Sequence, residues 1–151
     1  SLFQEGTTLY HWGNKSLTEI QEDVQAFAQH TAHLHQTELL LTDYTPGNIL
    51  QTKTGFAFVD TNRMQKGKVS IEQGLKNMAG LWMQPEVADF LVQEYLATRG
   101  TQCGQRELLL MRKYRKDFWH RFAKKHHINT AIDHTDLNGS TYSFNILQTI
   151  Q

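Results

Sequence analysis

Two turn signals, one at Pro46-Gly47 and one at Gly55, most constrain what this chain can fold into. Pro46 fixes its own φ at about −65°, and Gly47 tolerates φ > 0, so the pair favours a tight turn. Short apolar runs lie on both sides of Gly55, which is the pattern of a β-hairpin. We therefore predict a hairpin that begins just after Asn48 and delivers Asp60 at its end.

The polar residues around this hairpin indicate a chemistry. Asn48 follows Asp43 by five residues, and Asp60 follows the second apolar run. Phosphoryl transfer needs a carboxylate that accepts the proton of the attacking hydroxyl, and an amide oxygen and a second carboxylate that hold Mg²⁺. The simpler alternative is that Asp and Asn only make turns, where both are favoured. The hairpin after Asn48, preceded by a long amphipathic helix, favours phosphoryl transfer with Asp43 as base and with Asn48 and Asp60 on the metal.

The chain resembles the kinase superfamily and, more narrowly, the lipopolysaccharide kinases that phosphorylate Kdo or heptose of the lipid A inner core. The segments that carry the resemblance are Thr42–Leu50, Val59–Met64, Ser70–Trp82 and Glu94–Gly100. The resemblance covers about residues 8 to 126 and is most specific at the catalytic loop and the metal-binding strand. It implies a kinase-like C-terminal lobe at 1–126 and a tail at 127–151. It also implies ATP as substrate, Mg²⁺ as cofactor and a glycolipid or sugar as acceptor.

Two positions depart from the kinase pattern. Leu41 stands where the histidine of H-x-D is usual, and Thr61-Asn62 stand where D-F-G has Phe and Gly. Since that histidine normally braces the catalytic loop, we expect a looser loop geometry.

The other half of a kinase is not evident in this sequence. It contains no G-x-G-x-x-G loop and no lysine in a V-A-I-K-like strand, and only about 40 residues precede Asp43. Two interpretations stay open. One is an ATP-dependent kinase of a lipopolysaccharide sugar, represented here by its catalytic lobe. The other is a non-catalytic, kinase-derived helical interaction module or a truncated fragment. In either case, exposed apolar residues such as Leu2, Phe3 and Leu9 are expected to favour self-association.

Composition narrows the class of protein. The 151 residues suit one domain, and the 15 basic and 15 acidic residues cancel, which argues against a nucleic-acid partner. Cys103 is the single cysteine, so no internal disulfide can form. No apolar run has the length of a membrane span. We expect a cytoplasmic protein, with peripheral contact at the inner membrane surface as a further expectation.

The helix signals predict a mainly α fold with one small β-hairpin. Ser16 and Glu19 have capping-box spacing, and apolar residues then recur every three or four positions to about Gln36. Further helices are expected at 70–83, 85–98 and 103–126, and a basic loop at 61–69. The segment 2–12 reads as irregular or extended.

Three polar clusters have two interpretations each. His30, His33 and His35 could ligate a metal, although a structural or solvated role is favoured because no third ligand at a recognisable spacing accompanies them. The basic and aromatic run 112–121 could meet an anionic lipid headgroup, although a helix with its aromatic residues packed inward is favoured. The basic residues just after the metal strand, Arg63, Lys66 and Lys68, could contact an anionic acceptor or form a charged loop.

Overall fold

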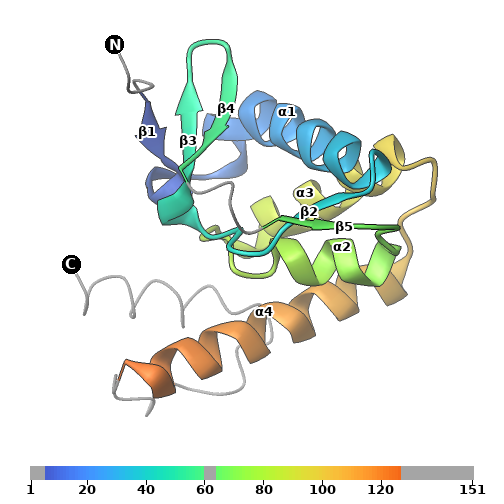
Figure 1. Ribbon diagram of the computed structural model, residues 1–151. Coiled ribbons are helices and arrows are strands. Elements are labelled where there is room, and N and C mark those ends of the chain that lie inside the picture. The colour runs from blue at the N-terminus through green and yellow to red at the C-terminus, as the bar shows by residue number, and fades with distance from the viewer. Residues whose placement is uncertain (1–5, 60–63, 127–151) are drawn as a thin grey trace.

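The computed structural model describes residues 6–59 and 64–126, which form four α-helices and two small antiparallel sheets (Figure 1). The helices are α1 (Leu17–Gln36), α2 (Ile71–Met78), α3 (Pro85–Thr98) and α4 (Gln105–Lys125). The strands are β1 (Thr7–Thr8), β2 (Leu39–Leu41), β3 (Ile49–Thr52), β4 (Gly55–Phe58) and β5 (Met64–Lys66), with 3-10 turns η1 (Leu9–Trp12) and η2 (Pro46–Asn48). The fold is therefore mixed and mostly helical, which is compatible with the predicted mainly α class.

The predicted hairpin is present as the antiparallel pair β3 and β4, which turns at Gly55. Gly55 has φ +149°, a conformation that L side chains rarely adopt. Two features of the sheets were not predicted. Strand β1 pairs with β3 and completes a three-stranded sheet, and β2 pairs with β5 in a second sheet. The segment predicted as a loop at 61–69 thus contains a short strand.

Helix α1 begins and ends where the sequence predicts. The backbone N–H of Ser16 donates to Glu19 Oε1 (3.0 Å), so the expected capping box forms. The buried face of α1 carries Ile20, Val24, Phe27, Ala28, Thr31, Ala32 and His35. This stripe packs against α3, which runs behind α1 in Figure 1. The α1 and α3 pair forms the centre of the hydrophobic core.

Helix α2 starts at its predicted cap but ends at Met78, not near Met83. Ser70 Oγ accepts from the N–H of Gln73 (3.1 Å), and Gln73 Oε1 accepts from the N–H of Ser70 (2.8 Å). Beyond Met78 the chain turns at Gly80, where a Cβ atom would lie 2.8 Å from the ring of Phe118. The helix therefore ends where the backbone must approach an aromatic ring of α4.

Helix α4 is fixed to the chain between α2 and α3 by a buried arginine. The guanidinium of Arg115 donates to the carbonyls of Leu81 and Met83, at 2.8 Å each. Nearby, the rings of Trp119 and Trp82 meet edge to face, with their centroids 4.4 Å apart. These contacts hold α4 alongside α2, as Figure 1 shows.

Several expectations fall outside the described residues. They concern Leu2 and Phe3, the segment 60–63 with Asp60 and Arg63, and the tail 127–151. Leu9, which was expected to be exposed, is instead buried in the hydrophobic core, so the expectation of self-association is wrong for this residue. Within residues 6–59 and 64–126, no helix combines the length and the apolar character that crossing a membrane would take.

Candidate functional site

The pairing of β2 with β5 closes the chain around the predicted catalytic loop. Leu41, two residues before Asp43, is the ladder partner of Met64. The chain from 41 to 64 therefore leaves and returns at one place, with the β3–β4 hairpin in between. The pairing thus joins the two ends of the segment that contains the predicted catalytic loop and the hairpin.

The side chain of Asn48 links the ends of the catalytic loop. Its Nδ2 donates to the carbonyl oxygen of Asp43 and to Thr45 Oγ1, at 3.2 Å each. A carbonyl only accepts, so the amide nitrogen must face into the loop. The Oδ1 atom of Asn48 consequently faces the other way. An amide oxygen in a fixed orientation is the kind of ligand that Mg²⁺ accepts.

The end of β4 is bonded to the same asparagine. The N–H of Val59 donates to the carbonyl oxygen of Asn48 (3.0 Å). Val59 directly precedes Asp60, the second predicted metal ligand, which lies outside the described residues. The structure therefore brings together the segments of Asp43 and Asn48, and it brings the residue before Asp60 to Asn48.

The loop turn does not use Gly47 in the way that the sequence predicts. Among the described glycines, the positive φ values belong to Gly55, Gly67 and Gly100, so Gly47 does not adopt the expected φ > 0. It lies instead within a 3-10 turn that starts at the buried Pro46. A Cβ atom at Gly47 would lie 3.3 Å from the ring of Tyr10. The ring of Tyr10 thus leaves little room for a side chain at this position.

Aromatic packing holds the loop on the Asn48 side of Asp43. The ring of Tyr44, next to Asp43, is buried and stacks on Phe27 and Phe58, with centroids 5.6 Å apart in both pairs. Its hydroxyl bonds Thr31 Oγ1 on α1 (2.6 Å). Burial raises the pKa of Tyr44, so its hydroxyl stays protonated. Helix α1 and the hairpin together thus fix the backbone on the C-terminal side of Asp43.

A chain of polar side chains holds the other side of the loop. Asn77 of α2 donates through Nδ2 to the carbonyl of Leu41 (2.8 Å), so its Oδ1 faces His35 Nε2 (3.0 Å). His35 Nε2 must then carry the proton, and His35 Nδ1 accepts from the hydroxyl of Tyr95 (2.6 Å). That hydroxyl in turn accepts from Arg99 (2.7 Å). We call Asn77, His35, Tyr95 and Arg99 the polar relay.

The polar relay braces the loop that was expected to be loose. Every member donates in the same direction, from the Arg99 guanidinium to the carbonyl of Leu41. Burial lowers the pKa of His35 to about 4, so the ring is neutral at pH 7, as this arrangement requires. The loop is therefore braced from α2 although Leu41 replaces the histidine of the kinase pattern. No local signal in the sequence points to Asn77, because its partners lie 36 and 42 residues away.

Asp43 opens onto a hollow formed with α4. The hollow has a volume of about 520 Å³, and its lining residues are Asp43, Thr45, Phe118, Arg121, Phe122, Lys125 and His126. This volume lies in the range of small-molecule sites. A carboxylate thus faces a space that also carries cationic and aromatic side chains.

The histidine cluster has a structural role in the part of the chain that is described. His35 belongs to the polar relay, and His30 packs its ring against Phe56 and Phe58, with centroids 6.0 and 5.6 Å away. Burial lowers the pKa of His30, which keeps it neutral. His33 is exposed. No group of three potential metal ligands occurs among the described residues.

The basic run of α4 divides into cations with and without structural partners. Arg115 is buried on two carbonyls, and Arg112 pairs with Asp89 (2.8 Å). Trp119 is buried, so the favoured inward packing of aromatic residues is confirmed for it.

The basic residues after the hairpin are not part of the Asp43 hollow: Lys66 and Lys68 are exposed and do not line it. The hollow is lined instead by Arg121 and Lys125, at the end of α4.

Comparison with family models, with curated proteins and with solved structures gives no match to this chain. The functional assignment therefore rests on the geometry of the loop and of its surroundings.

Proposed function

We propose that this chain is the catalytic lobe of an ATP-dependent kinase that phosphorylates the Kdo or heptose sugar of the lipopolysaccharide inner core. Asp43 accepts the proton of the sugar hydroxyl, and Asn48 and Asp60 hold Mg²⁺ on the nucleotide phosphates. Carboxylate and amide oxygens suit Mg²⁺, and waters and phosphates complete its octahedron. Catalysis then consists mainly of positioning and charge neutralisation.

The hydrogen bonds around Asn48 carry this proposal. One side chain is bonded to the backbone of Asp43, and the backbone of the same residue accepts from Val59. A bond from Asn48 to the Asp43 backbone, and a bond to Asn48 from the residue before Asp60, support a site shared by these three residues. The pairing of β2 with β5 on either side of the loop supports the same arrangement, because it joins the two ends of the segment that contains Asp43 and Asn48.

The hollow beside Asp43 supports the choice of acceptor. A Kdo unit carries a carboxylate as well as hydroxyls, and Arg121 and Lys125 supply cations within the same hollow as Asp43. A guanidinium can bind a carboxylate through two parallel hydrogen bonds. We also propose that the protein works at the cytoplasmic face of the inner membrane, where its glycolipid acceptor would lie.

The test combines titration of Mg²⁺ and ATP into the chain with an assay of phosphate transfer to a Kdo-bearing lipid. We expect weak, Mg²⁺-dependent nucleotide binding and slow transfer, because these 151 residues contain no glycine-rich loop to orient the phosphates. Each missing donor to the transition state costs on the order of 10² to 10³ in rate. Asp43→Asn should abolish the remaining transfer, and Glu22→Gln on the exposed face of α1 should not change it.

Two outcomes would contradict the proposal. Transfer that survives Asp43→Asn would exclude Asp43 as the base. Absence of any Mg²⁺-dependent nucleotide binding at millimolar concentrations would favour the interaction module over the kinase.

A further inference from the structure

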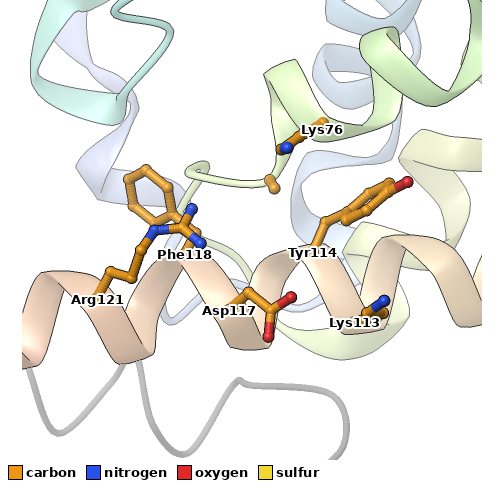
Figure 2. A pocket seen from close by; sticks show the side chains of 7 residues that line it. Lys76, Lys113, Tyr114, Asp117, Phe118 and Arg121 are labelled. Atoms are coloured by element: carbon orange, nitrogen blue, oxygen red, sulfur yellow. The ribbon is translucent and has the colours of Figure 1, made fainter.

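A second, smaller hollow lies between α2 and α4, next to the Asp43 hollow. Its volume is about 190 Å³, and its lining residues are Lys76, Ala79, Lys113, Tyr114, Asp117, Phe118 and Arg121. Figure 2 shows Lys76 approaching from α2 and the charged residues following one another along α4. The two hollows share Phe118 and Arg121. A space below the usual 300 Å³ of ligand pockets suits a small ion or one functional group better than a whole sugar.

The charged residues that line this hollow are mostly cationic. Three cations face one carboxylate, which leaves a formal net charge of +2. Elsewhere on α4, the basic side chains Arg106 and Arg112 are paired with Glu72 and Asp89 (2.6 and 2.8 Å).

The three cations of the hollow differ from those paired residues. Within the described part of the chain, Lys76, Lys113 and Arg121 form no ion pair. Their charges therefore remain available to a ligand.

The walls of the hollow are held in place by buried contacts. Arg115, which lies in sequence between Tyr114 and Asp117 of the hollow, ties α4 to the carbonyls of Leu81 and Met83. Phe118 fits against Gly80, where no side chain larger than hydrogen could be accommodated without movement. These contacts hold the backbones of α2 and α4 side by side, and the side chains of Lys76, Lys113 and Arg121 extend from them as exposed cations at the edge of the hollow.

We propose that Lys76, Lys113 and Arg121 form an oxyanion subsite that binds a phosphate group of the acceptor while the acceptor's hydroxyl lies at Asp43. The inference deepens the proposed function and rests on it for the role of the subsite. The acceptor is then a sugar with at least two anionic groups, one in each hollow, and Arg121 lies between them. A phosphate monoester is the chemical class that the subsite recognises.

The subsite can be tested without nucleotide. Inorganic phosphate is titrated into the ¹⁵N-labelled chain and compared with sodium chloride at equal ionic strength. We expect saturable shifts of the amide signals of residues 76–80 and 113–121. Arg121→Gln and Lys76→Gln should each weaken phosphate binding by about tenfold, the loss expected for one charge-assisted hydrogen bond. Asp117→Asn should strengthen phosphate binding, because it removes the opposing carboxylate.

Arg106→Gln is the matched control, because it removes the same charge from the same helix at an exposed ion pair. It should leave phosphate affinity unchanged, and far-UV circular dichroism should show that every variant folds. If Arg106→Gln weakens binding as much as Arg121→Gln, or if the shifts do not saturate, the subsite is refuted. Asp43→Asn should not alter phosphate binding. If the subsite is refuted, the kinase assignment therefore still stands. If the chain binds phosphate at the subsite but does not bind Mg²⁺–ATP, only the kinase assignment is refuted.

Two further probes identify the source of the phosphate. Glucose 6-phosphate represents a soluble sugar phosphate, and phosphatidylcholine vesicles with phosphatidic acid represent a lipid headgroup. Binding of either probe, weakened by Arg121→Gln, supports the acceptor role and names the source. Binding of inorganic phosphate alone, with neither ester bound, would overturn that role.

Discussion

The loop that carries Asp43 is held by different forces at its two ends. On the side of Leu41, the polar relay reaches the backbone carbonyl through four directional hydrogen bonds. On the side of Asn48, the ring of Tyr44 is stacked between Phe27 and Phe58. The polar end fixes the orientation of the backbone and depends on one neutral histidine. The aromatic end contributes burial, which is independent of pH. Stability and precision of this loop therefore come from separate sets of residues.

The largest effect is expected at the aromatic end. Tyr44→Ala removes a fully buried ring and leaves a cavity between Phe27 and Phe58. We expect the free energy of unfolding to fall by about 4 kcal/mol, in line with other buried aromatic truncations. Urea denaturation followed by circular dichroism measures it. A loss below about 1 kcal/mol would mean that the ring is not part of the core.

The second effect belongs to the polar end and depends on pH. Burial holds the pKa of His35 near 4, below its ordinary value of 6.5. The unfolded chain therefore binds a proton that the folded chain does not bind, so stability falls as the pH decreases from about 6.5 to 4. The full loss is on the order of 3 kcal/mol.

The measurement is urea denaturation between pH 7 and pH 4 for the wild type and for His35→Gln. The carboxylates of the chain add their own pH dependence in both proteins, so the difference between the two slopes isolates His35. Tyr44→Phe should keep the wild-type slope. Equal slopes for the wild type and His35→Gln would show that His35 titrates normally.

The third effect tests the direction of the polar relay. Asn77→Asp keeps the shape of the side chain but replaces the donor to the Leu41 carbonyl with a second acceptor. We expect a loss of about 2 kcal/mol at pH 7, the cost of an unsatisfied buried group. The loss should shrink near pH 5, because a carboxylate favours the protonated form of His35. A loss that grows on acidification would mean that the relay runs in another direction.

The smallest effect is that of the Tyr44 hydroxyl. Tyr44→Phe keeps the stacked ring and removes only the bond to Thr31. A loss of about 1 kcal/mol is expected in the same urea experiment. A loss similar to that of Tyr44→Ala would assign the stability of this end to the hydrogen bond, and the contrast between the two ends would disappear.

The sequence predicts the local features of this protein and misses those that connect distant segments. The stripe from Ile20 to Thr31 and the cap at Ser16 predict α1 because helix periodicity and capping act within a few residues. The sequence predicts an end of α2 near Met83, but the helix ends at Met78, shortly before Gly80 packs closely against Phe118 of another helix. The spacing of Asp43 and Asn48 predicts a shared loop, and the bond between them agrees.

The support of the site could not be predicted in the same way. Asn77 looks like any polar residue of a short helix, and only folding brings it to Leu41. The hollow beside Asp43 likewise needs α4, because one of its lining residues, Arg121, lies 78 positions after Asp43 in the sequence (121 − 43). A single sequence does not show which of the many cations of α4 are neutralised by partners and which remain available.

The central claim is that the loop around Asn48 binds the metal of a nucleotide complex, and Mn²⁺ tests it most directly. Mn²⁺ prefers the same oxygen ligands as Mg²⁺ and broadens nearby NMR signals. Mn²⁺ with ATP should selectively broaden the amide signals of residues 43–50 and 57–59, and Asp60→Asn should remove the effect. Broadening that is spread over surface carboxylates, or that is unchanged in Asp60→Asn, would contradict the claim.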